Sequence, residues 1–117
     1  MTPFGQRLRE LRLAHGRQLK DMAKALKVSS AYLSALEHGH RARPKTGFVQ
    51  QVAAFFTLAW DEVDELKALA DISDPKVTIA TGGLSPLATE LANRLAKRIG
   101  DLDATSLAAL NEQLKPK

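Results

Sequence analysis

Two blocks of hydrophobic residues between positions 18 and 39 repeat at the spacing of an α-helix. The first block places four apolar residues on one helix face: Leu19, Met22, Ala23 and Leu26. Leu33 and Leu36 form the inward face of a second helix. Val28 is a single apolar residue between the blocks, and Ser29 is a favourable N-cap for the helix that follows. The pattern therefore predicts two short helices joined by a tight turn.

Helices joined in this way are typical of a helix-turn-helix, whose second helix can enter the major groove of DNA. The stretch resembles the DNA-binding core of the phage-repressor and Cro-like family, the Xre-type helix-turn-helix transcriptional regulators. The matching residues are Gly16, Leu19, Met22, Ala23, Leu26, Val28, Ser29, Tyr32, Leu33, Ser34, Leu36, Glu37 and Gly39. The alternative is an antiparallel helix pair in the core of an unrelated all-α protein.

The resemblance implies an all-α fold. We expect a five-helix lambda-repressor-like DNA-binding domain at residues 1–72, a linker or short strand at 73–83, and C-terminal dimerisation helices at 84–117. Thr2 and Pro3 should begin the first helix, and Gly16 should end it in a left-handed conformation. The aromatic residues between Phe48 and Trp60 follow helical spacing, and we expect them in the core.

Hydrophobic residues after position 76 form a surface that one chain cannot easily bury. Residues 76–79 alternate and are β-branched, which favours a short strand or an extended linker. Two amphipathic helices follow, and their apolar stripes suit pairing with a second copy of the chain. The residues assigned to this homodimer interface are Val77, Ile79, Leu84, Leu87, Leu91, Leu95, Ile99, Leu107 and Leu110. The alternative is that this segment folds back on the first domain.

Charge is unevenly distributed along the chain. The net formal charge is +4, but residues 1–60 carry ten Lys or Arg against three acidic residues, whereas residues 61–117 carry seven against ten. A basic half joined to a mildly acidic half suits a domain that binds double-stranded DNA and a separate part that binds a partner. An ordinary solvated surface would also account for the charge taken alone.

The resemblance assigns a set of residues to DNA contacts. They are Gln18, Lys27, Ser29, Ser30, Ala31, Tyr32, Ser34, Arg41, Arg43 and Lys45. Ser30, Ala31 and Ser34 would face the bases, with Tyr32 beside the phosphates. None of the base-facing residues is Arg, Asn or Gln, the side chains that make bidentate contacts to guanine or adenine. We therefore expect weak direct readout, with specificity from DNA shape, bridging water or arginines elsewhere.

The segment from His40 to Thr46 is a proline-containing loop rich in positive charge. The resemblance implies that this loop follows the sugar-phosphate backbone. Lys45, directly after the proline, would reach the minor groove, and Arg43 stands just before it. Such contacts would give affinity and salt dependence. The alternative is a flexible, solvated loop without a partner.

Three further expectations concern single positions. By the resemblance, Arg12 pairs with Glu37 and locks the first helix to the recognition helix; two independent surface charges are the alternative. Gln18 replaces the usual Ser or Thr cap, so the second helix either frays at its start or is held by a phosphate. Lys27 replaces a frequent glycine, and a positive φ there would cost roughly 1 kcal/mol.

Catalytic patterns are absent from the sequence. The three histidines, His15, His38 and His40, form no metal motif or catalytic triad, and there is no cysteine. We expect no enzyme activity, no cofactor and no metal. No apolar run resembles a signal peptide or approaches the roughly 20 residues of a membrane span. We therefore expect a cytoplasmic protein without a membrane segment.

These observations predict a sequence-specific DNA-binding transcriptional regulator that acts as a repressor. It would bind an inverted-repeat operator as a homodimer, with half-sites about one helical turn apart. The alternative is the antitoxin of a toxin–antitoxin pair, which binds DNA and a partner toxin. The repressor is favoured because the C-terminal segment looks like a self-association element and no disordered inhibitory tail is evident.

Overall fold

A computed structural model describes residues 1–116 of the chain, and the predicted all-α fold is confirmed. The described residues form α-helices and one short 3₁₀-helix, without a strand. The chain divides into two compact units, Met1–Val77 and a second that starts at Thr78.

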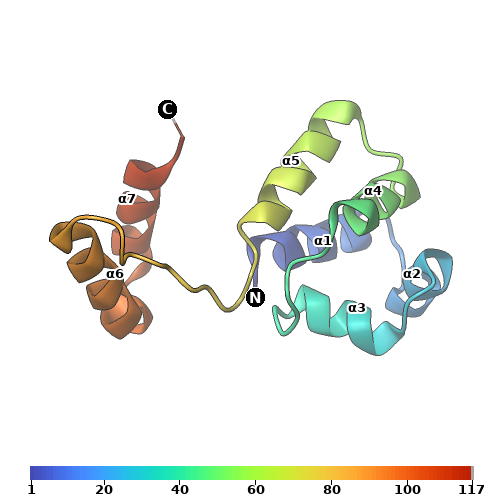
Figure 1. Ribbon diagram of the computed structural model, residues 1–117. Helices are drawn as coiled ribbons and strands as arrows, with labels where there is room; N and C mark the ends of the chain where they lie inside the picture. Colours follow the sequence, from blue (N-terminus) through green and yellow to red (C-terminus); the bar gives the residue numbers. More distant parts are fainter. Residues whose placement is uncertain (117) are drawn as a thin grey trace. The chain divides into compact units, whose positions relative to one another are not determined.

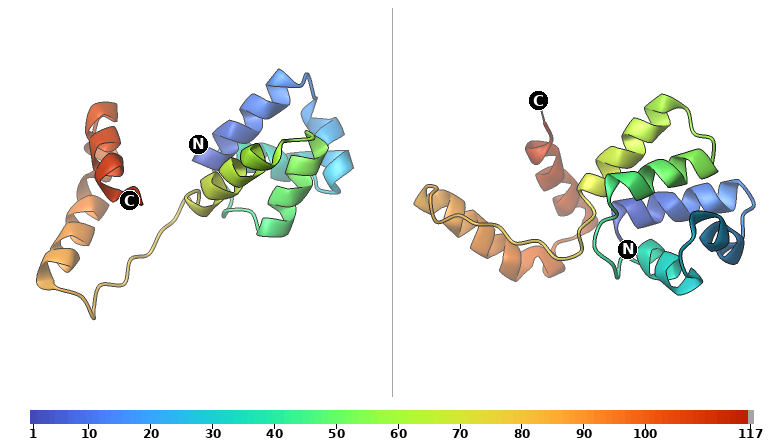
Figure 2. Two further views of the ribbon diagram at one scale, coloured as in Figure 1. Left: turned by 90° about the horizontal axis from the view of Figure 1, so that it is seen from above. Right: turned by 45° about the vertical axis from the view of Figure 1, so that its right-hand side comes forward.

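The first unit contains five helices: α1 (Pro3–Ala14), α2 (Leu19–Leu26), α3 (Ser30–Glu37), α4 (Thr46–Phe55) and α5 (Trp60–Asp71). Helix α1 lies between α3 and α5, while α2 packs against both α3 and α4 (Figures 1 and 2). The five helices share one core, formed by Phe4, Leu8, Leu11, Met22, Ala23, Leu26, Leu33, Leu36, Val49, Val52, Phe56, Leu66 and Ala70. This core includes the residues predicted for the inward faces of the two central helices except Leu19, which is partly buried against it. The helix-turn-helix is therefore held by the rest of the unit.

Local capping sets the ends of several helices. The Thr2 hydroxyl accepts a hydrogen bond from the Gly5 N–H at 3.0 Å, and Pro3 is the first residue of α1. Gly16, just after α1, has φ 63°, which glycine adopts at little cost. Both features were predicted from the sequence and are confirmed.

The second unit contains α6 (Pro86–Arg98), the 3₁₀-helix η1 (Ile99–Asp101) and α7 (Ala104–Leu114). Ser85 caps α6, and the Asp103 carboxylate caps α7 by accepting the Ser106 N–H at 2.8 Å. This hydrogen bond lowers the pKa of the Asp103 carboxyl, so the cap is intact at neutral pH and is lost only on acidification. No residue of these three helices is buried within the chain. Residues 76–80 have no regular secondary structure in the single chain.

The prediction that the aromatic residues are core residues is wrong for Trp60. Phe56 is buried, and Phe48 and Phe55 are partly buried against the core, but Trp60 is 79% exposed. Trp60 is the first residue of α5, six positions before the buried Leu66. At about 100° per residue, this places Trp60 about 240° around the helix from Leu66, away from the core.

Ser73 joins the end of the first unit to its beginning. Its buried hydroxyl accepts the backbone N–H of Phe4 at 2.9 Å and donates to the carbonyl of Leu69. The N–H of Phe4 belongs to the first turn of α1, where no carbonyl of the same helix can accept it. Ser73 therefore satisfies a buried donor across 69 residues and fixes α1 to the end of α5.

Gly5 allows the closest contact between α1 and α3. A Cβ atom at this position would lie 2.5 Å from the carbonyl oxygen of Leu36 and 2.6 Å from that of Glu37. Both atoms belong to the backbone, so a side chain could enter only if the two helices moved apart.

We therefore expect Gly5→Ala to lower the free energy of unfolding by about 1–3 kcal/mol, as overpacking does elsewhere. Urea unfolding followed by circular dichroism measures this. The matched control is Gly47→Ala in α4, where an added Cβ meets no atom within 4 Å. This control should keep its stability or gain up to about 1 kcal/mol. Equal behaviour of the two variants would show that the α1–α3 contact is not tight.

Candidate nucleic-acid interface

The turn between α2 and α3 has the geometry that places a second helix at the surface. Lys27 ends α2 in the left-handed conformation, with φ 58° and ψ 42°. Val28 packs partly buried against the core, and the Ser29 hydroxyl accepts the Tyr32 N–H at 3.0 Å, which caps α3. Because Leu33 and Leu36 face the core, the opposite side of α3 is left to solvent.

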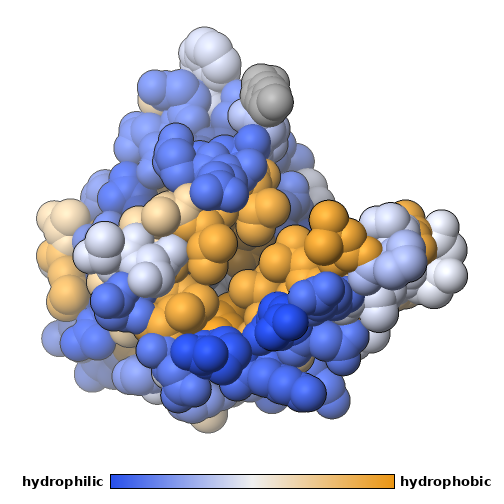
Figure 3. Space-filling view, turned by 90° about the vertical axis from the view of Figure 1, so that its left-hand side faces the viewer, coloured by the Kyte–Doolittle hydropathy of each residue, from blue (hydrophilic) through white to orange (hydrophobic). Residues whose placement is uncertain are grey.

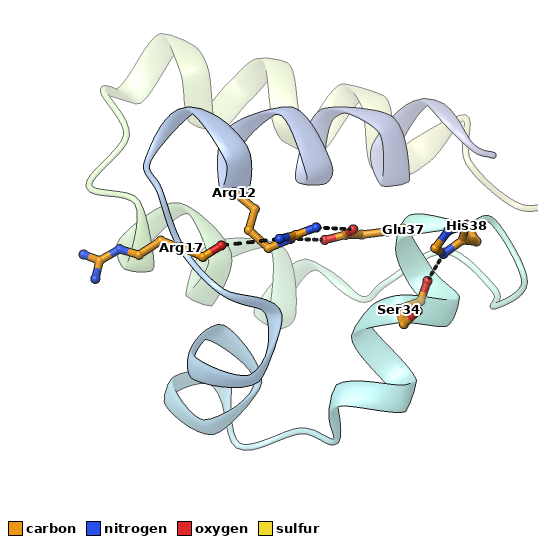
Figure 4. Close-up of polar contacts among 5 residues, drawn as sticks. All are labelled: Arg12, Arg17, Ser34, Glu37 and His38. Atoms are coloured by element: carbon orange, nitrogen blue, oxygen red, sulfur yellow. Dashed lines mark hydrogen bonds and ion pairs between the residues drawn. The ribbon is translucent and has the colours of Figure 1, made fainter.

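The predicted base-facing residues lie on this outer side. Ser30 and Ala31 are exposed in the first turn of α3, and Ser34 is half-buried one turn later. The imidazole Nδ1 of His38 hydrogen-bonds to the backbone carbonyl of Ser34 at 2.7 Å (Figure 4). This contact uses the carbonyl of Ser34 and not its hydroxyl.

Arg12 and Glu37 form a bidentate ion pair between α1 and α3 (Figure 4). Arg12 donates from Nε to Oε2 of Glu37 at 2.8 Å and from Nη2 to Oε1 at 3.2 Å. A third donor, Nη1, reaches the backbone carbonyl of Arg17 at 3.4 Å. The Glu37 side chain is 3% exposed, so its carboxylate is almost fully removed from water.

The contact with Glu37 favours the charged form of Arg12. The hydrogen bond to Glu37 raises the pKa of Arg12, more than burial lowers it. A buried pair of this kind fixes geometry more surely than it adds stability, because desolvation offsets most of the Coulomb attraction. Together with the contact at Gly5, it holds α3 at a set angle to α1.

The loop between α3 and α4 surrounds a hollow of about 320 Å³ with cations and aromatic rings. The Arg41 guanidinium lies 5.1 Å from the centre of the Tyr32 ring, and Tyr32 meets Phe48 edge to face at 5.9 Å. The cation–π contact with Tyr32 limits the conformations of the Arg41 side chain, in contrast to a side chain that only water surrounds. Lys45 is exposed on the same loop.

Arg43, the third loop cation, is held within the first unit. Its Nη1 donates to Oδ1 of Asp71 at 3.0 Å, and its Nε lies 3.4 Å from Oδ2 of Asp74. Its backbone N–H also donates to Asp74 Oδ1 at 2.9 Å. Arg43, which the resemblance predicts to contact DNA, is instead paired with two carboxylates in the free protein. These partners follow it by 28 and 31 residues, and no local sequence pattern indicates them.

Helix α2, which follows the turn after α1, and helix α4, which follows this loop, begin without a side-chain cap. Gln18 precedes α2 and Lys45 precedes α4, and neither side chain makes a capping hydrogen bond in the described structure. The first N–H groups of such helices need acceptors and attract anions. Gln18 itself is exposed.

The comparisons with known proteins agree with this geometry. The helix-turn-helix domain family matches residues 3–66. The uncharacterised HTH-type transcriptional regulator RghRB of Bacillus subtilis (strain 168) is 36% identical over 63 residues, which are 54% of this chain. The match covers 45% of that relative, so the chain spans about half of its length. No solved structure matches.

The first unit is thus a DNA-binding helix-turn-helix domain, with α2 and α3 as its two central helices. The chain belongs to the helix-turn-helix domain family, a family of DNA-binding regulators and not of enzymes.

Among residues 1–116, no three His, Asp or Glu side chains converge in a way that could hold a metal ion. No helix in this part of the chain combines the length and the apolar character needed to cross a membrane.

Lys27 provides a test of the turn. We expect Lys27→Gly to keep the free energy of unfolding or raise it by up to about 1 kcal/mol, because glycine adopts this conformation without strain. Its affinity for DNA should fall, by about twofold to tenfold at low salt, because a charge near the duplex is lost. Chemical unfolding and fluorescence anisotropy with labelled duplex measure the two effects.

The matched control is Thr57→Gly, because Thr57 also has a positive φ, 52°, but lies at the end of α4. It should relieve strain in the same way and leave DNA affinity unchanged. If Lys27→Gly binds DNA as tightly as the unchanged protein, Lys27 does not lie near the duplex.

Proposed function

We propose that the chain is a transcriptional repressor that binds an inverted-repeat operator as a homodimer. The observation that carries the proposal is the locked, outward-facing helix α3 beside the loop cations. Arg12 and Glu37 hold this helix on α1, and Ser29 caps its exposed first turn. A helix presented in this way enters a major groove without rearrangement of the domain.

The exposed residues of α3 favour recognition of DNA mainly through its backbone and shape, with few base contacts. Ser30 and Ser34 can hydrogen-bond to several bases, and the methyl group of Ala31 suits the methyl group of thymine. The cations Arg41 and Lys45 supply phosphate contacts, which set register and affinity. The proposal therefore assigns most of the binding energy to the backbone and much of the specificity to DNA shape.

Homodimer formation is proposed for the second unit. Large apolar side chains stay exposed there, among them Leu84, Leu87, Leu91, Ile99, Leu110 and Leu114. In Figure 3, apolar side chains gather on the face turned toward the viewer, with hydrophilic ones around them. A second copy of the chain would cover such a surface, and a two-fold dimer would match two half-sites.

The DNA contacts can be tested by removing two loop charges. We expect the double variant Arg41→Ala/Lys45→Ala to bind duplex DNA more weakly and to lower the salt slope, d log K/d log[salt], by about 2 in magnitude, since each phosphate contact contributes about 0.9. Titrations at several salt concentrations measure this. Lys97→Ala/Arg98→Ala in α6 removes the same charge and should keep the slope. An unchanged slope in the loop variant would contradict the proposed contacts.

The dimer can be tested in the full chain by adding a charge to α6. Leu91 is 52% exposed in the single chain. We expect Leu91→Asp to shift the sedimenting species from two chains to one, because a buried, unpaired carboxylate disfavours the interface. Leu13→Asp in α1 is the control, at a side chain that is 61% exposed, and should leave the dimer intact. A Leu91→Asp protein that stays dimeric would place the interface elsewhere.

A further inference from the structure

The groups around Arg43 form a built site for an anion. Asp74 accepts the backbone N–H of Arg43 with Oδ1, and its Oδ2 forms an ion pair with Nε at 3.4 Å. Asp71 accepts a hydrogen bond from Nη1. A hollow of about 260 Å³ adjoins the site, and Lys45 and Thr46 line it together with Arg43 and Asp71. Guanidinium and backbone N–H donors converging in this way also bind phosphate.

The two aspartates are held loosely enough to be exchanged. The side chains of Arg43, Asp71 and Asp74 are 48%, 75% and 40% exposed, so water reaches all three. Exposed ion pairs are individually weak and are screened by salt. Asp71 ends α5 and Asp74 follows it, whereas Arg43 lies on the loop that borders α3 and α4.

We propose that this site binds a phosphate of the DNA backbone, and that Asp71 and Asp74 occupy it as internal competitors in the free protein. This inference rests on the proposed DNA-binding function. When the duplex docks, a phosphate oxygen replaces the carboxylates on Arg43, and the segment that follows α5 is released from the loop. Arg43 is therefore a phosphate ligand that the chain itself blocks until DNA arrives.

A double-mutant cycle separates this competition from a general effect of charge. Asp71→Asn/Asp74→Asn removes the competing charges, while the amide oxygen introduced by the second substitution can still accept the Arg43 N–H. We expect this variant to bind a 20-base-pair duplex about twofold to tenfold more tightly at low salt, the range that exposed pairs allow. The gain should vanish when Arg43→Gln is present as well, because the competition acts through that side chain.

Three other results would each overturn the inference. A gain that persists in the Arg43→Gln background would show that the aspartates only repel the duplex at a distance. Unchanged or weaker binding by the Asp71→Asn/Asp74→Asn variant would show that Arg43 is a structural residue that holds the loop. Failure of the unchanged protein to bind any duplex at low salt would contradict the proposed function itself.

A structural measurement completes the test. The backbone N–H of Arg43 should change its NMR chemical shift on DNA addition, together with that of Asp74. As a control, the N–H signals of Arg43 and Asp74 should have the same chemical shifts in the Lys97→Ala/Arg98→Ala protein as in the unchanged protein, both without DNA. Should the Asp71→Asn/Asp74→Asn variant fail to fold, Asp71→Asn alone serves in the cycle, since Asp71 contacts only the side chain of Arg43.

Discussion

The ion pair between Arg12 and Glu37 is the interaction on which the interface depends. The cap at Ser29 and the apolar residues of α3 form a helix but leave its angle to the domain undetermined. The bidentate pair sets that angle by joining α3 to α1, and the missing side chain at Gly5 lets the two backbones approach closely enough. Loss of either feature would leave α3 a well-formed helix but would change its orientation relative to α1.

On the DNA-binding surface that we propose, phosphate contacts would contribute more than base contacts. The exposed side of α3 carries Ser and Ala side chains, and its cations lie on the loop beyond it. Some of this positive charge is offset within the domain, because Arg43 is paired with two aspartates. A protein built in this way gains specificity when a deformable DNA site brings many backbone contacts into register at once.

The two units differ in whether they bury their own apolar residues. The first unit encloses its apolar residues around α1, and Ser73 closes the unit by satisfying a buried donor of that helix. The second unit buries no residue of its helices, and this exposure is the reason that we propose a partner surface for it. The division separates the groups suited to DNA from those suited to assembly.

The sequence by itself determined the all-α fold, the central helix pair, and the caps at Thr2 and Gly16. These features depend on residues three or four positions apart, so the local sequence pattern records them. Tertiary structure alone decided which residues distant in the chain meet. Neither the carbonyl oxygens facing Gly5 nor the partners of Ser73 and Arg43 leave a local signal, and Trp60 is exposed because of its place around α5. Such contacts follow from how whole helices cross, which no short stretch of sequence encodes.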